Sequence, residues 1–306
     1  MDALWIPISI FAALMQAVRT AGQRTLNQKM STMGTTYVRS LFGLPLMMLY
    51  LFFIMTYVDG AWPKLTLSFL LFVAGGALTQ ILATALLIQM FRLRNFAVGT
   101  MLTKTDIIMT AIIGSLIFSE SLTGGGWWAL AVVLAGVFLM LIGKLGIGIF
   151  RLSGQSSVGG LFSKSMRVAV VCAFMFTLSY LLYREATLNL GDAGAVWRGA
   201  WTVVIATSMQ VIGLGIWLLW KEAAVFTQLW PNRGIACFIG VSSALGSVGW
   251  FTAFAMENAS YVRAVGQIEA VFTLAISWLY FKEKITKLEF TGIIITVLGV
   301  LLFRLL

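Results

Sequence analysis

The chain has 306 residues, of which 60% are hydrophobic and only 10% are charged. A soluble domain carries about 25% charged residues, so this composition excludes a soluble protein and favours an all-α integral membrane protein. The net charge of +10 comes from Lys and Arg that lie singly between apolar runs, so nucleic acid is not an expected partner. The sequence contains no histidine, which removes His-based catalytic triads and His metal sites. We therefore expect no enzyme activity, cofactor or metal.

The apolar runs, taken in chain order between turn-forming residues, predict ten transmembrane helices. Their predicted ranges are 4–26, 36–57, 66–90, 96–118, 124–143, 168–188, 195–219, 234–255, 259–280 and 288–305. The longest connection runs from Lys144 to Arg167, is rich in Gly and Ser, and has the composition of a linker. We expect a first five-helix repeat at 1–146, a linker at 147–166 and a second five-helix repeat at 167–306.

The two halves of the chain resemble each other in sequence. Shifting the second half back by 163 positions aligns them without a gap, and Asn95, Asp106 and Glu120 then meet Asn258, Glu269 and Glu283. Apolar matches between two membrane helices are weak evidence of a repeat, whereas these polar matches all occur at the same shift. Because each repeat has an odd number of spans, the halves must lie in opposite orientations, as in transporters with inverted repeats. The duplication therefore predicts alternating access.

Two short segments resemble a known family. Residues 118–123 (Phe-Ser-Glu-Ser-Leu-Thr) and 281–286 (Phe-Lys-Glu-Lys-Ile-Thr) resemble the ends of the two EamA modules of the drug/metabolite transporter superfamily. Ser119 and Lys282 stand where that family usually has a turn glycine, and Arg39 resembles its arginine early in the second span. The resemblance implies ten spans in two inverted repeats. It also implies a central cavity built from the first, third, fourth, sixth, eighth and ninth spans.

Two acids inside the predicted spans are the candidate proton-coupling residues. A charge at the bilayer centre costs roughly 2.5–3.5 kcal/mol, so ionisable residues there point to function. Asp106 and Glu269 occupy matching repeat positions, each with a threonine four residues later on the same helical face. A carboxyl group removed from water holds its proton more tightly, which suits proton exchange during transport. The alternative is that the two acids only hold helices together through hydrogen bonds.

Basic and amide residues of the same two spans are candidate substrate ligands. Lys104 lies on the opposite side of its helix from Asp106, whereas Arg263 and Gln267 share one face of the ninth span. Lys104 and Arg263 suit an anionic group, which an arginine can grip through two bonds. Arg263 lies only one turn into its span, however, and the favoured expectation is that its side chain extends to the membrane surface.

The first, sixth and eighth spans supply the other predicted substrate-binding residues. Gln16, Arg19, Thr20 and Gln23 form a polar stripe on one side of the first span, which cannot face hydrocarbon. We expect the stripe to line a water-filled cavity, unless the outer half of this helix extends beyond the membrane. Tyr180 is a candidate in the sixth span, where an interfacial tyrosine belt or a local Arg184–Glu185 interaction is the alternative.

Trp250 of the eighth span is the last candidate, because an aromatic wall beside small residues suits an organic substrate. The second, fifth, seventh and tenth spans are almost purely apolar, and we expect them to carry no chemistry. Val133 of the fifth span, for example, should face lipid. Cys172 and Cys237 lie in apolar stretches and are not expected to form a disulfide.

Loop charges predict the orientation in the membrane. Thirteen Lys and Arg lie in the odd-numbered loops, against four in the even-numbered loops and the termini. By the positive-inside rule, the odd loops are cytoplasmic and both termini lie outside. The family resemblance implies the opposite orientation, with both termini inside.

The sequence predicts a secondary active transporter, with export as the favoured direction, of a small polar or amphipathic metabolite such as an amino acid. We expect a multi-pass protein of the bacterial plasma (inner) membrane, with proton coupling. The partners would be the substrate and the lipid bilayer, and a homodimer is compatible but not required. The alternatives are a lipid-linked carrier or flippase, which needs an open lateral groove, and a non-transporting membrane subunit. The sequence lacks a Gly-x-x-x-x-Gly-Lys-Ser/Thr motif, so ATP-driven transport by this chain is not expected.

Overall fold

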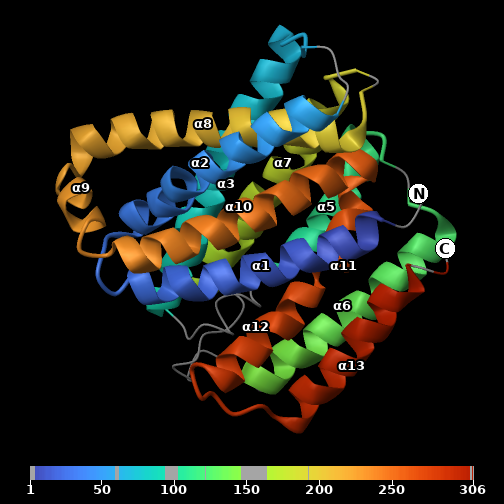
Figure 1. The fold of residues 1–306 in the computed structure, drawn as a ribbon. Helices are drawn as coiled ribbons and strands as arrows, with labels where there is room; N and C mark the ends of the chain where they lie inside the picture. Colours follow the sequence, from blue (N-terminus) through green and yellow to red (C-terminus); the bar gives the residue numbers. More distant parts are fainter. Residues whose placement is uncertain are drawn as a thin grey trace.

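A computed structural model describes residues 4–58, 62–93, 103–120, 122–145, 164–191, 193–303 and 305. These residues form helices and turns, and they include no strand. Trp5 and Phe303 both pack against Tyr261, with ring centroids 6.4 and 5.8 Å away. The two ends of the described chain therefore lie on the same side of the molecule, as an even number of membrane crossings requires (Figure 1).

The long helices agree with the predicted spans to within a few residues at each end. They are α1 (Trp5–Leu26), α2 (Thr32–Tyr57), α3 (Leu67–Leu93), α6 (Gly124–Leu145), α7 (Lys164–Leu188), α8 (Ala195–Lys221), α10 (Arg233–Met256) and α13 (Lys287–Leu302). A short helix that the sequence did not predict, α9 (Ala224–Leu229), connects α8 to α10. Residues 147–163 of the predicted linker (147–166) lie outside the described residues. Its last three residues belong to α7.

Two of the predicted spans depart from a continuous α-helix within the described residues. The span expected at 96–118 is described from residue 103, where the 3-10 turn η1 (Thr103–Thr105) precedes α5 (Asp106–Ile117). The span expected at 259–280 consists of α11 (Ala259–Gly266) and α12 (Ile268–Leu279), separated at Gln267. Both breaks fall just before the duplicated acids. Helical periodicity did not predict them, because the apolar pattern runs through both.

Seven helical segments among the described residues are long and apolar enough to cross a membrane, with α11 and α12 counted together. The first helix, α1, has sufficient length at 22 residues, but its polar stripe makes it less apolar. The helices α5 and α13 are too short to be counted among these segments, since they contain 12 and 16 residues. The protein is therefore an integral multi-pass membrane protein, whereas the number of ten spans stays a prediction.

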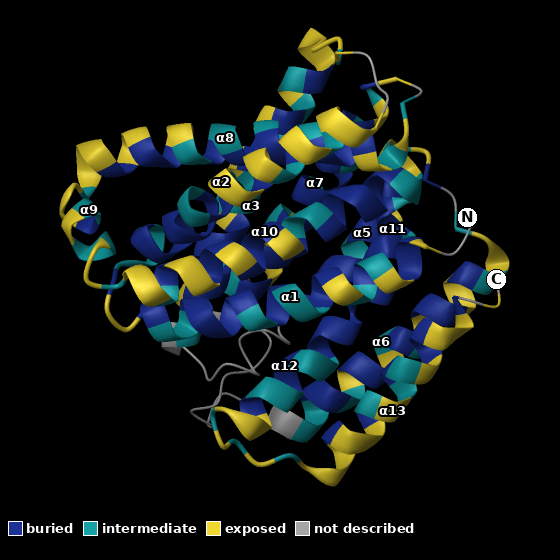
Figure 2. Ribbon diagram, in the orientation of Figure 1, coloured by how far each residue is buried: buried dark blue, intermediate teal, exposed yellow. Residues whose placement is uncertain are grey.

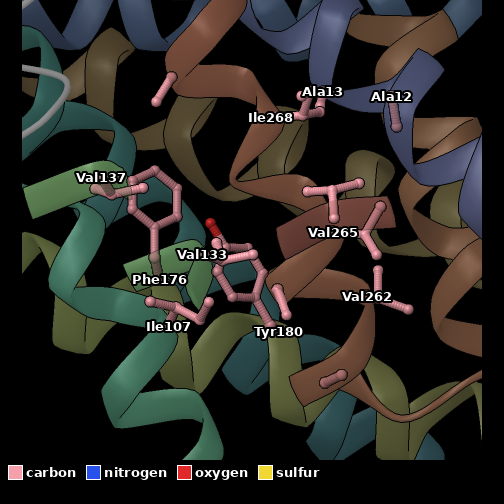
Figure 3. Close-up of a cluster of buried hydrophobic side chains, with 14 of the residues drawn as sticks. Ala12, Ala13, Ile107, Val133, Val137, Phe176, Tyr180, Val262, Val265 and Ile268 are labelled. Carbon is pink, nitrogen blue, oxygen red and sulfur yellow. The ribbon is translucent and has the colours of Figure 1, made fainter. Parts of the chain in front are cut away.

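Burial follows the pattern expected in lipid. Large apolar side chains such as Phe52, Trp128 and Trp220 are more than 60% exposed, and exposed positions follow the outer faces of the helices (Figure 2). Apolar side chains from α1, α5, α6, α7, α11 and α12 meet in the interior (Figure 3). Val133 belongs to this cluster and is 0% exposed, so the expectation that it faces lipid is wrong. It contacts α13, because Gly299 allows the two helices to approach closely.

The helices α6 and α13 pack along each other at one edge of the molecule (Figure 1). A Cβ added at Gly136 would lie 2.5 Å from the backbone nitrogen of Thr296, and one added at Gly292 would lie 2.6 Å from the carbonyl oxygen of Gly136. Only residues without a side chain allow this separation, as at other close helix crossings in membranes. The fifth and tenth spans thus pack directly against each other.

The two repeats end their broken spans in the same way. Ser119 and Lys282 have positive φ values of 56° and 57°, in the left-handed region that glycine adopts most readily. The amides of the following residues, Glu120 and Glu283, each donate to a helix carbonyl at 3.0 Å. These are the positions at which the resembled family usually has glycine. The conformation explains that preference, and its repetition supports the register of the duplication.

Cys172 is buried and Cys237 is exposed, and both are free thiols, as expected.

Candidate functional site

Two buried ion pairs connect the repeats in the interior. Arg263 Nη2 lies 2.7 Å from Asp106 Oδ2, and Lys104 Nζ lies 2.6 Å from Glu269 Oε2. All four side chains are at most 5% exposed. Each acid is paired with a base from the other repeat, so moving the repeats apart here must break or exchange both pairs. Loss of one partner from a buried pair is costly, because the other charge is left uncompensated.

Both acids stand in the first turn of a half-helix. Asp106 is the first residue of α5, directly after η1, and Glu269 is the second residue of α12, directly after the break at Gln267. The N-terminus of a helix carries a partial positive charge, which favours a carboxylate. Discontinuous helices of this kind position binding groups near the bilayer midplane in secondary transporters. The two acids thus occupy equivalent places, each at the start of a half-helix.

Amide side chains extend the two ion pairs. Gln16 Nε2 donates to Glu269 Oε2 at 2.9 Å, and its Oε1 accepts from Trp250 Nε1 at 2.9 Å. Gln267 Nε2 donates to Asp106 Oδ1 at 3.5 Å. With the contacts of Arg263 to two aromatic rings, the structure brings eight of the predicted residues into one connected region: Gln16, Trp250, Lys104, Glu269, Arg263, Asp106, Gln267 and Tyr180. Their contact with a substrate stays a prediction.

Arg263 lies between two aromatic rings. Its guanidinium carbon is 4.2 Å from the ring centroid of Tyr180 and 5.0 Å from that of Trp250, distances typical of cation–π contacts. Gly266 permits the close packing of Trp250, since a Cβ there would lie 2.5 Å from the indole ring. Arg263 is only 1% exposed, so the expectation that it extends to the membrane surface is wrong. Asp106 and the two rings compensate its charge inside the protein.

The polar stripe of α1 faces the interior of the protein. Gln16, Arg19, Thr20 and Gln23 are 9%, 4%, 0% and 0% exposed, which confirms that the stripe avoids lipid. Thr20 Oγ1 donates to the backbone carbonyl of Gln16 at 2.6 Å. Arg19 Nε and both polar atoms of the Gln23 side chain have no hydrogen-bond partner in the described part of the chain. Whether the stripe lines a transport cavity stays a prediction.

Sequence reasoning missed a second buried network, which joins α2, α3, α7 and α8. Arg39 Nη2 and Ser40 Oγ donate to Gln210 Oε1 at 2.9 and 2.8 Å. Gln210 Nε2 donates in turn to Gln80 Oε1 at 2.7 Å and to the Tyr183 hydroxyl at 2.9 Å. The second and seventh spans thus carry buried polar chemistry, contrary to expectation. Gln210 could have indicated this network from the sequence, because an amide side chain in an apolar span needs a hydrogen-bond partner on another helix.

Two more Arg–Glu pairs lie at the ends of the broken spans. Arg24 Nη1 is 3.4 Å from Glu283 Oε1, and Arg184 Nε is 3.8 Å from Glu120 Oε1. Glu120 Oε1 also accepts the backbone amide of Ala259 at 2.9 Å, so this carboxylate caps the N-terminus of α11. Arg184 interacts electrostatically with Glu185, as the alternative expected, and it also contacts Glu120 of the other repeat. The alternative of an interfacial tyrosine belt is wrong, since Tyr180 and Tyr183 are 6% and 1% exposed.

These two outer pairs lie at opposite ends of the molecule. The amide of Thr123, three residues after Glu120, donates to the Tyr261 hydroxyl at 2.9 Å, and Tyr261 packs against Trp5 at the start of α1. Arg24 lies in the last turn of α1, nineteen residues further on, or about 28 Å at 1.5 Å per residue. This separation matches the thickness of the hydrocarbon core, about 30 Å. The two Arg–Glu pairs therefore lie about one hydrocarbon thickness apart.

Two cavities open between helices, and the predicted site residues do not line them. One of about 550 Å³ lies among α2, α3 and α7, and one of about 360 Å³ lies among α1, α10 and α12. The second is mostly apolar, with walls that include Val18, Phe238 and Ile276. Among the described residues, the predicted ligands contact one another instead.

A comparison with protein families identifies the fold. The model of the EamA-like transporter family matches the chain twice, at residues 3–142 and 163–305. The chain belongs to the EamA-like transporter family. It is thus a membrane transporter of the drug/metabolite type, and members of this family are generally not enzymes. The resemblance of the turn segments at 118–123 and 281–286 to EamA modules is confirmed.

Solved structures share this fold. One, described only as "Crystal structure of protein", superposes with a TM-score of 0.67 at 12% sequence identity, covering 100% of this chain and 98% of the other. At that identity the likeness concerns the fold of the EamA-like chain and not its substrate. No curated protein matches the chain.

Proposed function

We propose that this EamA-like protein is a ten-span secondary active transporter that works by alternating access. The proposed substrate is a small polar or amphipathic metabolite such as an amino acid, moved outward across a bacterial plasma membrane. The observation that carries the proposal is the pair of buried ion pairs, Arg263–Asp106 and Lys104–Glu269, which join the inverted repeats beside two helix breaks. The chain contains both halves of this arrangement, so a homodimer is compatible but not required.

The outer Arg–Glu pairs suit alternating closure. Arg24–Glu283 lies near one membrane face and Arg184–Glu120 near the other. A rocking motion of one repeat against the other would separate one pair while it closes the other. A single central site would then open to each side in turn. Aromatic surfaces of Tyr180 and Trp250 beside Arg263 suit a substrate that has both an apolar and a polar part.

Proton coupling in this proposal works through the central ion pairs. Protonation of Asp106 or Glu269 removes the negative charge that holds Arg263 or Lys104. The connection between the repeats is then weakened, and they can move apart. Release of the proton restores the pair and recloses the site. The movement of the repeats is thereby linked to binding and release of a proton.

A lipid-linked carrier or flippase is the second candidate function. The observation in its favour is the apolar cavity of about 360 Å³ among α1, α10 and α12. A flippase also needs polar groups along such a groove to carry a headgroup. The polar stripe of α1 is buried away from this cavity, so we rank this function below transport of a soluble metabolite.

Cysteine labelling tests whether the α1 stripe becomes exposed to water. Thr20→Cys and Gln23→Cys, each in a Cys172→Ala/Cys237→Ser background, should react with a water-soluble thiol reagent in membrane vesicles. The reaction should be at least about tenfold faster than at a lipid-facing site, because the thiolate that reacts does not form in hydrocarbon. Both positions are 0% exposed in this structure, so the reaction requires a conformation in which water reaches them.

The matched control is Ala135→Cys on α6, whose native side chain is exposed on the apolar surface. Val133 is unsuitable, because it is buried against α13. Equal labelling at Thr20, Gln23 and Ala135 would contradict a water-filled pathway along α1.

A further inference from the structure

The interior of the protein holds four buried cations and four buried acids among the described residues, and two of the acids, Glu120 and Glu289, cap the helices α11 and α13. Two of its buried cations, Lys104 and Arg263, are neutralised by Glu269 and Asp106. Two more, Arg19 on α1 and Arg39 on α2, are 4% and 3% exposed. In the part of the chain that the structure describes, neither forms an ion pair with a carboxylate.

Arg19 and Arg39 lie in one region. Arg19 interacts electrostatically with Glu269 and Tyr180. Arg39 interacts electrostatically with Arg19, Tyr180 and Tyr183, and hydrogen bonds through Gln210 connect its guanidinium group to the Tyr183 hydroxyl on α7. Buried like charges close together destabilise a protein unless an opposite charge lies between them. The region between α1, α2 and α7 therefore has the electrostatics of an anion site.

Unsatisfied hydrogen-bond donors accompany these charges. Arg19 Nε and Arg39 Nε have no partner among the described residues, and neither do the Gln23 amide and Thr35 Oγ1. Gln23 follows Arg19 by four residues on α1, and Thr35 precedes Arg39 by four on α2, so each lies one helical turn from its arginine. A buried donor without a partner costs about 1–3 kcal/mol, and an oxyanion accepts several such donors at once. Planar guanidinium groups match the oxygens of carboxylate and phosphate.

We propose that Arg19 and Arg39 bind the anionic group of the transported substrate, a carboxylate or a phosphate ester that carries up to two negative charges. Lys104 and Arg263 then serve the central ion pairs instead of the ligand. This assignment rests on the proposed transport function and narrows its substrate to organic anions. The tyrosines on the facing side of α7 border the site, so a substrate with an apolar portion fits beside the charge.

The test measures thermal unfolding of the full chain in nanodiscs of neutral phosphatidylcholine, with inorganic phosphate or succinate added at constant ionic strength. Either anion should raise the unfolding temperature, because a ligand that binds only the folded state stabilises it. Arg19→Met and Arg39→Met should each raise the half-saturating concentration about 10–100-fold. Without anion, both variants should unfold at a higher temperature than the wild type, since each removes a buried charge that has no ion-pair partner among the described residues. Arg233→Met, at an exposed arginine, is the control and should respond to anions as the wild type does.

Three results would overturn the assignment. The first is a wild-type unfolding temperature that does not respond to phosphate or succinate. The second is variants that unfold at a lower temperature yet keep the full anion response, which would show that the arginines serve packing alone. The third is stabilisation that requires Arg19 but appears only when the nanodiscs contain phosphatidylglycerol in place of phosphatidylcholine. That result would identify a lipid headgroup as the occupant.

Equilibrium binding needs no gradient and no opening to both sides, so its failure is distinguishable from failure of the transport function. Anion binding by a protein in which Thr273→Cys is labelled from one side only would support this site and contradict transport. Labelling of Thr273→Cys from both sides without anion binding would do the reverse.

Discussion

Replacing Glu269 with Gln, or Asp106 with Asn, is expected to reduce pH-gradient-driven uptake of the transported metabolite in proteoliposomes to background. Exchange at equal concentrations on both sides should largely persist, because exchange needs the central site but no net proton movement. An amide keeps the size of the carboxyl group and its hydrogen bond to Lys104 or Arg263, but it cannot bind the coupling proton. The two acids occupy matching positions beside the helix breaks, so at least one of the variants should show this split.

Glu257→Gln is the control for these variants, since Glu257 caps the end of α10 and takes no part in the central pairs. Gradient-driven rates equal to the wild type in both Asp106→Asn and Glu269→Gln would show that the acids only hold helices together. Loss of folded protein in both variants would favour the same structural role.

Replacing Arg263 with Met is expected to lower the free energy of unfolding by about 3–5 kcal/mol, because Asp106 is then left as an uncompensated buried charge. The variant also loses the cation–π contacts with Tyr180 and Trp250. Adding Asp106→Leu should restore most of the loss, since a buried ion pair is often replaceable by apolar side chains of similar volume. Denaturant unfolding in detergent micelles, followed through the double-mutant cycle, measures the coupling of the two residues.

The exposed Arg233→Met variant should unfold like the wild type, within about 0.5 kcal/mol. A double variant that is as unstable as, or less stable than, Arg263→Met alone would contradict the ion-pair account. In that case the aromatic contacts of Arg263, rather than Asp106, would carry its contribution.

The helices themselves were predictable, because apolar runs bounded by Gly, Pro and Asp have a direct physical meaning in a bilayer. The 163-residue register was also predictable, since acids and turn residues matched together. It led to the two positive-φ positions, Ser119 and Lys282, as sites of one repeated turn. The breaks at η1 and Gln267 were not predictable, because the residues on both sides keep a helical apolar pattern.

The partners of the buried charges could not be read from the sequence. Asp106 and Arg263 lie 157 positions apart in the chain, and only the packing of the two repeats brings them together. Arg263 was therefore expected at the membrane surface, where a single arginine near a helix end usually lies. Gln210 was overlooked in an apolar span, although its amide joins Arg39 to α3 and α7.

The most direct measurement for alternating access is labelling of Thr273→Cys from each side of sealed membrane vesicles. Thr273 is 0% exposed, lies one turn after Glu269 on α12, and its hydroxyl has no partner among the described residues. In a Cys172→Ala/Cys237→Ser background, the account predicts that a membrane-impermeant thiol reagent reaches this cysteine from either side, while the vesicles stay tight to ions. Labelling from one side only, or from neither, would contradict a central site that opens in turn to both faces.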